Sequence, residues 1–161
     1  MNMTSLTHLA VLVPALGCGL MAGFFFAFSI CVMRALSATP PEHGISAMQS
    51  INVAVINPWF LTPFFGMAVL SVLLNIAAVM RWQEPGAAYV MAGGLLYLLG
   101  TFLVTILFNV PRNNALAAVE AASKEGTTLW ANYLITWTRW NHVRTIAALV
   151  AAASFTIALA R

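Results

Sequence analysis

Long apolar segments alternate with short polar segments along this chain. The apolar segments cover about residues 9–34, 58–80, 87–109 and 134–160. A helix rises about 1.5 Å per residue, so a segment of about 20 residues or more crosses the hydrocarbon core of a bilayer, which is about 30 Å thick. Four such spans with short connections predict an all-α membrane protein in which residues 1–161 form one domain, an antiparallel bundle of four transmembrane helices.

Two of the connections carry helix signals of their own. The first begins with Thr39-Pro40-Pro41-Glu42, residue types that favour the first turn of a helix. It ends at Asn57-Pro58, because the residue before proline is biased away from the helical region. The third is rich in alanine over residues 111–123 and is followed by Lys124-Glu125-Gly126, which we expect to break the helix. We therefore predict short interfacial helices in the first and third connections.

Composition assigns the chain to the membrane. Of its 161 residues, 61% are hydrophobic and 7% are charged, whereas a soluble domain carries about 25% charged residues. The formal net charge of +3 comes from seven Lys and Arg against four acidic residues. These charges are spread over the connections and form no basic patch, so we expect the lipid bilayer as a partner and no nucleic acid.

Polar residues gather at one end of the predicted bundle. Because the four spans alternate in direction, the first and third connections lie on the same side of the membrane, away from both termini. The side chains with hydrogen-bonding or titratable groups near that side include Arg34, His43, Gln49, Asn52, Asn109, Arg112, Asn113, Asn141, His142 and Arg144. Buried polar groups in an apolar setting need partners, so these residues predict a network or a site for a polar ligand group.

The fourth span begins in an unusually polar stretch, residues 137–145. The uncharged run that follows is about 16 residues, or about 24 Å of helix, which is too short to cross the bilayer alone. Four residues then share one helix face, namely Trp130, Trp137, Asn141 and Arg144. This face is either one wall of a pocket or part of the belt of aromatic residues found at headgroup depth in membrane proteins.

Metal and transport sites have weaker support in the sequence. His43 and His142 fall on the same side and could together ligate copper or a haem iron. However, the chain has no Asp and no H-E-x-x-H pattern. We therefore expect no metal, with the two histidines as the alternative. A transporter would place charges along the bundle, where only Asn75 interrupts the apolar residues.

Several sequence elements together resemble a known family. They are the Gly-rich first span ending near Arg34, the Gln49…Asn52…Asn57-Pro58 stretch, the run Asn109-Val110-Pro111-Arg112-Asn113-Asn114, and Trp137…Trp140-Asn141-His142-Val143-Arg144-Thr145. The chain thus resembles the bacterial domain-of-unknown-function family 1772, which includes the anthrone oxygenases. The resemblance implies a four-helix protein of the bacterial inner membrane. It also implies a monooxygenase that converts an anthrone-type polyketide to the anthraquinone with dioxygen as co-substrate and no other cofactor.

The family chemistry suggests a role for each residue at the polar end. An anthrone has an acidic benzylic C–H that is conjugated to a carbonyl, and loss of the proton gives an enolate that reacts directly with dioxygen. Such a site needs a base, donors for the enolate oxygen and a flat apolar slot. We expect His142 to be the base. The expected oxyanion donors are Arg144, Asn141, Asn109 and Asn113. The expected substrate-binding residues are Asn52, Gln49, Trp137, Trp140, Arg112 and Arg34.

A second class of function stays open at this point. A small bundle of this kind could bind haem, copper, a quinone or a lipid, or act as a subunit of a larger assembly, without catalysis of its own. The glycines of the first span predict close helix packing at Gly19 and Gly23, within one chain or between the subunits of a homo-oligomer.

Overall fold

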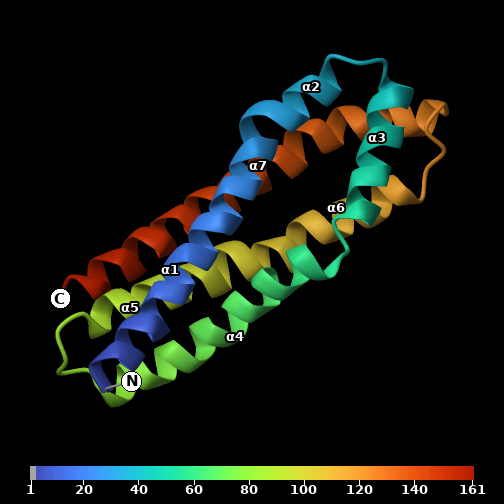
Figure 1. Ribbon diagram of the computed structural model, residues 1–161. Helices are drawn as coiled ribbons and strands as arrows, with labels where there is room; N and C mark the ends of the chain where they lie inside the picture. Colours follow the sequence, from blue (N-terminus) through green and yellow to red (C-terminus); the bar gives the residue numbers. More distant parts are fainter. Residues whose placement is uncertain (1–2) are drawn as a thin grey trace.

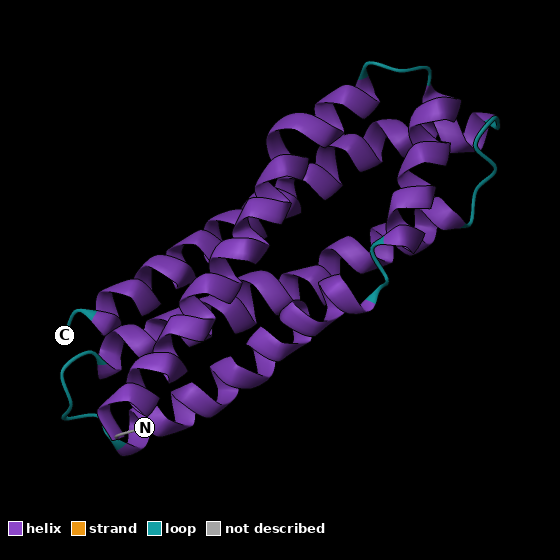
Figure 2. Cartoon of the chain, in the orientation of Figure 1, coloured by secondary structure: helices purple, strands orange, loops and turns teal. Residues whose placement is uncertain are grey.

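The computed structural model describes residues 3–161, of which residues 3–8 are described by their backbone alone. This part of the chain is helical and contains no strand (Figure 2). The elements in chain order are α1 (Met3–Ala27), η1 (Phe28–Val32), α2 (Met33–Ser37), α3 (Pro41–Ala54), α4 (Pro58–Met80), α5 (Ala87–Leu95), η2 (Leu96–Leu103), η3 (Thr105–Asn109), α6 (Val110–Ala117) and α7 (Lys124–Leu159). The η elements are π-helical turns inside longer helices.

Four of the described helical stretches are long and apolar enough to cross a membrane, namely Leu9–Ser37, Pro58–Met80, Ala87–Ala117 and Lys124–Leu159. The predicted four-helix membrane bundle is therefore confirmed. Neighbouring helices run in opposite directions, and both termini lie at one end with the α4–α5 turn (Figure 1). The α2–α3 and α6–α7 connections lie at the other end (Figure 1). The first helix packs along α7, while α4 packs against α5 and η2.

The buried side chains form two clusters along the bundle. One surrounds Phe25, Tyr97 and Phe155, toward the end with the termini. The other joins α3 to the first half of α7 through Ile45, Met48, Leu116, Trp130 and Trp137. Many large apolar side chains remain exposed on the outside, as is expected where the solvent is lipid hydrocarbon.

The polar face predicted for the last helix is confirmed. Trp130, Trp137, Asn141 and Arg144 are all buried against other helices. The two most exposed tryptophans are instead Trp59 and Trp82, at 91% and 53% exposure. The aromatic belt is thus a poor explanation for Trp130 and Trp137, which pack inward.

The third helix continues further than the sequence predicts. The pattern predicts that it leaves the membrane at Asn109, before Pro111, but it runs without a break to Ala117. Proline lacks an N–H and its ring clashes with the preceding turn of an ordinary helix. Here the preceding turn is a wide one, since Val110 N–H bonds to the carbonyl of Thr105, five residues earlier. This π-helical turn makes room for the proline.

The third connection also differs from the prediction. The interfacial helix predicted to reach residue 123 ends at Ala117, and α7 begins at Lys124, where the sequence predicts a break. The cause is a cap: Ser123 has extended backbone and its Oγ accepts a bond of 2.8 Å from Gly126 N. A Cβ at Gly126 would lie 2.5 Å from the carbonyl oxygen of Glu120, so glycine is needed inside this first turn. In the first connection the predicted helix is confirmed as α3, and its position at the membrane interface stays a prediction.

Glycines allow close packing between helices in the third helix. The glycine pair predicted to do so in the first helix, Gly19 and Gly23, does not. A Cβ at Gly94 would meet the side chain of Asn75, and one at Gly100 would meet Ala147. A Cβ at Gly19 or Gly23 would have nothing within 4 Å, and both glycines lie on the outward face of α1. Their predicted packing within the chain is therefore wrong, because both glycines are exposed on the outside of the bundle. A contact between subunits at these glycines stays a prediction.

Candidate functional site

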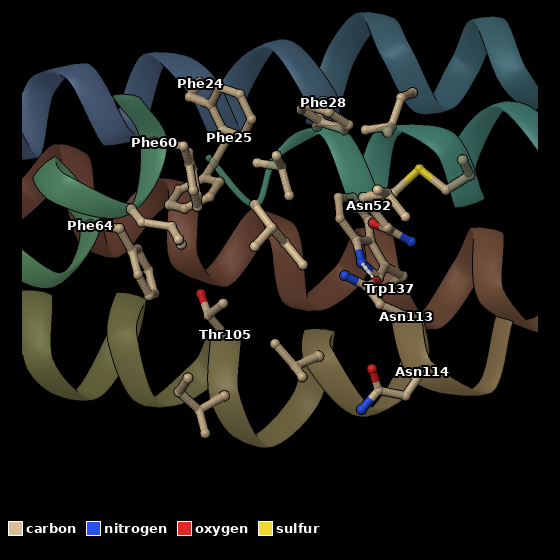
Figure 3. A pocket seen from close by; sticks show the side chains of 18 of the residues that line it. Phe24, Phe25, Phe28, Asn52, Phe60, Phe64, Thr105, Asn113, Asn114 and Trp137 are labelled. Carbon is tan, nitrogen blue, oxygen red and sulfur yellow. Dashed lines mark hydrogen bonds between the residues drawn. The ribbon is translucent and has the colours of Figure 1, made fainter. Parts of the chain in front are cut away.

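A cavity of about 320 Å³ opens between the first helix, α3, α4, the third helix and α7 (Figure 3). This volume lies within the range of small-molecule sites, which is about 300–1,000 Å³. Most of the lining is apolar. The aromatic lining residues are Phe24, Phe25, Phe28, Phe60, Phe64, Phe65 and Trp137. The polar lining residues are Gln49, Asn52, Thr105, Asn113, Asn114 and Arg144.

Stacked and tilted phenylalanines form the apolar wall of the cavity. Phe60 stacks on Phe64 with 5.6 Å between ring centroids and 14° between planes, and its ring lies 4.9 Å from that of Phe24. These rings come from α1 and α4 and lie together at one end of the cavity (Figure 3). Aromatic pairs at such distances add to the stability of a packed wall. The result is a packed aromatic wall that can contact an aromatic ring system.

Arg144 brings a positive charge to this wall. Its side chain is 5% exposed, and its Nε donates to Asn141 Oδ1 at 2.9 Å. A longer contact of 3.4 Å joins Nη1 to Thr105 Oγ1. The guanidinium carbon lies 4.1 Å from the ring centroid of Phe25 and 4.9 Å from that of Trp137. The cation is therefore held by aromatic faces, which attract it electrostatically, and by neutral polar groups.

Arg144 has no protein counter-ion. The chain contains no Asp, and its four glutamates are all exposed, namely Glu42, Glu84, Glu120 and Glu125. Within residues 9–161 one salt bridge forms, between Arg81 and Glu84 at 3.8 Å, far from this site along the chain. An unpaired charge taken out of water costs several kcal/mol. A buried arginine without a counter-ion at a cavity wall is therefore a candidate position for binding a negatively charged ligand group.

Asn141 fixes the position of the guanidinium. Its Nδ2 donates to the carbonyl of Phe25 at 2.7 Å and to Ser29 Oγ at 2.6 Å. An arginine side chain only donates hydrogen bonds, so the amide oxygen of Asn141 must face Arg144. Both N–H groups and the oxygen of the Asn141 amide are thus used. Through these bonds Asn141 connects α7 to the first helix at the π-helical turn η1. Asn141 does not line the cavity itself.

A second set of hydrogen-bonded side chains lies where Asn113 of α6 contacts α7. Asn113 Oδ1 accepts from Trp137 Nε1 at 2.7 Å and from Tyr133 Oη at 2.8 Å. Figure 3 shows Asn113, Trp137 and Asn52 together at the end of the cavity opposite Phe60 and Phe64. Asn52 Nδ2 is buried without a hydrogen-bond partner in the described structure. This end of the cavity therefore carries amide groups that a ligand could satisfy.

Two other predicted amides have structural contacts. Asn109 is 1% exposed and does not line the cavity; its Nδ2 donates to the carbonyl of Trp137 at 3.2 Å, which ties η3 to α7. Gln49 lines the cavity, and its Nε2 donates to the carbonyls of Leu116 and Val119 at 2.9 and 3.1 Å. Gln49 thus holds α3 over the end of α6.

Besides Asn141 and Asn109, four more of the predicted residues do not line the cavity, namely His142, Arg34, Arg112 and Trp140. His142 and Arg34 are exposed, and neither is among the lining residues. His142 follows Asn141 directly, and consecutive helix residues point about 100° apart. Arg112 donates from Nε to Thr136 Oγ1 at 3.0 Å and from Nη1 to the carbonyl of Phe108 at 2.6 Å. Trp140 stacks on Phe108, with 3.6 Å between ring centroids, on the outer side of α7.

The described part of the chain offers few ligands for a metal ion. No group of three or more His, Cys, Asp or Glu residues that could hold a metal ion occurs there. His43, the second member of the alternative histidine pair, is exposed and does not line the cavity either. The side chains lining the cavity include no imidazole, thiol or carboxylate.

Sequence reasoning missed several residues of the site. The phenylalanine wall gave no signal, because segments that are apolar all round show no periodicity. Tyr133 could have been found, since it lies four residues before Trp137 and so shares its helix face. Ser29 and Thr105 could also have been noted as hydroxyls inside apolar spans.

The comparison with known families agrees with the resemblance of the motifs. Residues 58–154, more than half of the chain, match the family model described as "Anthrone oxygenase". This range contains Asn109, Asn113, Trp137, Asn141 and Arg144, while Gln49 and Asn52 lie before it. No curated protein and no solved structure matches the chain. The chain therefore belongs to the anthrone oxygenase family.

Proposed function

We propose that this protein is a membrane-embedded oxygenase that oxidises an apolar aromatic, anthrone-like substrate with dioxygen, holding the substrate as its enolate beside Arg144. One observation carries the proposal: the cavity is walled by aromatic rings, and its lining includes a buried cation that lacks a protein counter-ion. An aromatic enolate satisfies both features, because its ring system fits the wall and its oxygen supplies the negative charge. Membership of the family supports the same class of reaction.

The reaction balances without an external reductant. A ring CH2 group and one O2 give a ring carbonyl and one water, so one oxygen atom enters the product and the other leaves as water. The substrate first loses a proton from the CH2 group and becomes an electron-rich enolate. The enolate carbon then donates electrons to dioxygen, which dissolves well in the surrounding hydrocarbon.

The proposed role of Arg144 is to stabilise the enolate. Two unit charges about 4 Å apart interact by about 4 kcal/mol at an effective dielectric constant of 20. That energy is equivalent to lowering the pKa of the substrate C–H by about 3. Because no lining side chain is an ordinary base, we propose that the proton passes to water and that Arg144 favours the ionised form. Asn141 acts as a positioning residue, since it touches Arg144 and not the cavity.

A second candidate is a bundle that binds an aromatic anion without converting it. The specific observation in its favour is the lack of an imidazole, thiol or carboxylate among the lining side chains. A quinone in its reduced, ionised form would suit the same cavity. The two candidates differ in one measurable property, which is oxygen consumption on addition of an anthrone.

The test compares oxygen consumption by wild type, Arg144→Met and Arg144→Lys in lipid nanodiscs supplied with emodin anthrone. Nanodiscs without protein give the rate of spontaneous oxidation, and Arg139→Met, a change at an exposed arginine outside the cavity, is the matched control. We expect a loss of at least about 100-fold for Arg144→Met, the typical cost of removing an oxyanion donor. Arg144→Lys should be intermediate. A wild-type rate equal to the spontaneous rate would leave simple binding.

A further inference from the structure

The orientation of the Asn113 amide is set by its neighbours. The indole N–H of Trp137 can only donate, so the group 2.7 Å from it must be the amide oxygen of Asn113. The hydroxyl of Tyr133 donates to the same oxygen at 2.8 Å. Both contacts direct the NH2 group of Asn113 away from α7. Among residues 9–161 this NH2 group has no hydrogen-bond partner, and Asn113 lines the cavity.

Asn52 offers a second unused donor at the same place. It lines the cavity from α3 and lies next to Trp137 and Asn113 in Figure 3. Its Nδ2 is buried without a hydrogen bond in the described structure, and the Tyr133 hydroxyl is its neighbouring polar group. A buried donor left without an acceptor costs about 1–3 kcal/mol. Gln49, one turn earlier, donates from its own NH2 to the carbonyls of Leu116 and Val119.

Trp137 lies between this amide pair and Arg144. The guanidinium lies over the ring of Trp137, 4.9 Å from the centroid, whereas Asn113 lies at the Nε1 edge of the same ring. The cavity therefore presents two sets of donors, one charged and one neutral, to a ligand that covers the indole. Neither set includes a carboxylate.

We infer that Asn52 and Asn113 form a neutral subsite that binds an acceptor oxygen, such as a second carbonyl, on the same ring system whose anionic oxygen pairs with Arg144. The inference rests on the proposed function for the Arg144 end and adds the substrate class: a planar aromatic with two acceptor oxygens. A ligand with an apolar group at that position would leave the two amides unsatisfied. Discrimination by unpaired buried donors is stronger than discrimination by shape.

The experiment measures binding of two probes by quenching of tryptophan fluorescence in nanodiscs. The first probe, 2-hydroxyanthraquinone, has an ionisable hydroxyl and two ring carbonyls. The second, 2-hydroxyanthracene, has the hydroxyl and no carbonyl. The variant Asn52→Leu keeps the size of the side chain and removes the donor, and Asn52→Ala repeats the test with a smaller side chain. Asn132→Leu, the same change at an exposed position outside the cavity, is the control.

We expect each Asn52 variant to weaken binding of 2-hydroxyanthraquinone by about fivefold, the worth of one neutral hydrogen bond, and to leave binding of 2-hydroxyanthracene unchanged. Asn132→Leu should alter neither. Equal effects of Asn52→Leu on both probes, or none on either, would overturn the subsite.

Arg144→Met separates this inference from the proposed function. It should weaken both probes, since both carry an ionisable hydroxyl. If Arg144→Met weakens both probes while Asn52→Leu does not distinguish them, the subsite is wrong and the proposed function stands. If Arg144→Met weakens neither probe, the proposed function fails, and the subsite that rests on it fails as well.

Discussion

Asn141 and Arg144 lie one helical turn apart on α7, and the amide oxygen of Asn141 accepts a hydrogen bond of 2.9 Å from Arg144 Nε. The other end of the same amide is fixed to the first helix through the Phe25 carbonyl and Ser29. The guanidinium is thus positioned by neutral groups that leave its charge uncompensated. An arginine held in this way is available to a ligand anion, whereas one paired with a carboxylate is not.

Asn141→Asp tests whether an uncompensated charge is needed. The new carboxylate would keep an acceptor beside Arg144 and would supply a counter-ion within the protein. We expect oxygen consumption to fall by at least about tenfold, because a ligand anion would no longer be needed by the guanidinium. The measurement is turnover of emodin anthrone together with the melting temperature. Wild-type turnover in this variant would contradict the role assigned to Arg144.

Asn113→Leu should destabilise the fold. It leaves the Trp137 indole N–H and the Tyr133 hydroxyl without their shared acceptor, at about 1–3 kcal/mol for each buried donor. Trp137→Phe removes one of these donors, so it should cost less stability in the Asn113→Leu background than in wild type. Melting temperatures of the two single variants and the double variant form a double-mutant cycle. Strictly additive losses would mean that the hydrogen bond between the two residues contributes nothing.

His142→Ala should leave turnover close to that of wild type. The sequence suggests His142 as the base, but the residue is exposed and does not line the cavity. Oxygen consumption with emodin anthrone checks this, with His43→Ala, another exposed histidine, as the control. A loss of about 100-fold or more, the usual contribution of a general base, would return the histidine to the mechanism.

The cavity should be entered from the lipid. Several of its lining residues are exposed and apolar, and they include Ile106 at 39% and Phe65 at 47%. Ile106→Trp should narrow this opening and raise KM several-fold with little change in kcat. Leu107→Trp is a matched control, since Leu107 is exposed on the same turn but does not line the cavity. Equal kinetic effects of the two variants would count against entry between α4 and the third helix.

Sequence periodicity located the charged end of the site but not its apolar wall. Trp137, Asn141 and Arg144 stand out because they are polar or aromatic residues at helical spacing on one face, and all three are buried. Phe60 and Phe64 lie in the first half of α4, a helix that is apolar all round. No sequence pattern therefore separates its cavity face from its lipid face. Only packing against α1 makes that distinction.

The predictions from sequence were wrong where contacts between helices decide the outcome, for example which of two adjacent residues points inward. His142 and Asn141 have similar sequence signals, yet one points outward and the other inward because adjacent helix residues diverge by about 100°. The sequence pattern ends the third span at Asn109, but the helix continues through the π-helical turn and past Pro111. Hydrogen-bond patterns of this kind depend on neighbouring helices and leave no mark in a single sequence.

The most direct test of the account is the pKa of an acidic aromatic ligand when it is bound. The visible spectrum of 2-hydroxyanthraquinone changes on ionisation, so its pKa can be read in wild-type nanodiscs and in those carrying Arg144→Met. We predict that the pKa of the bound hydroxyl is lower by about 1 to 3 in wild type than in the variant, because the guanidinium favours the anion. The same pKa in both proteins would contradict the claim that Arg144 stabilises a ligand anion.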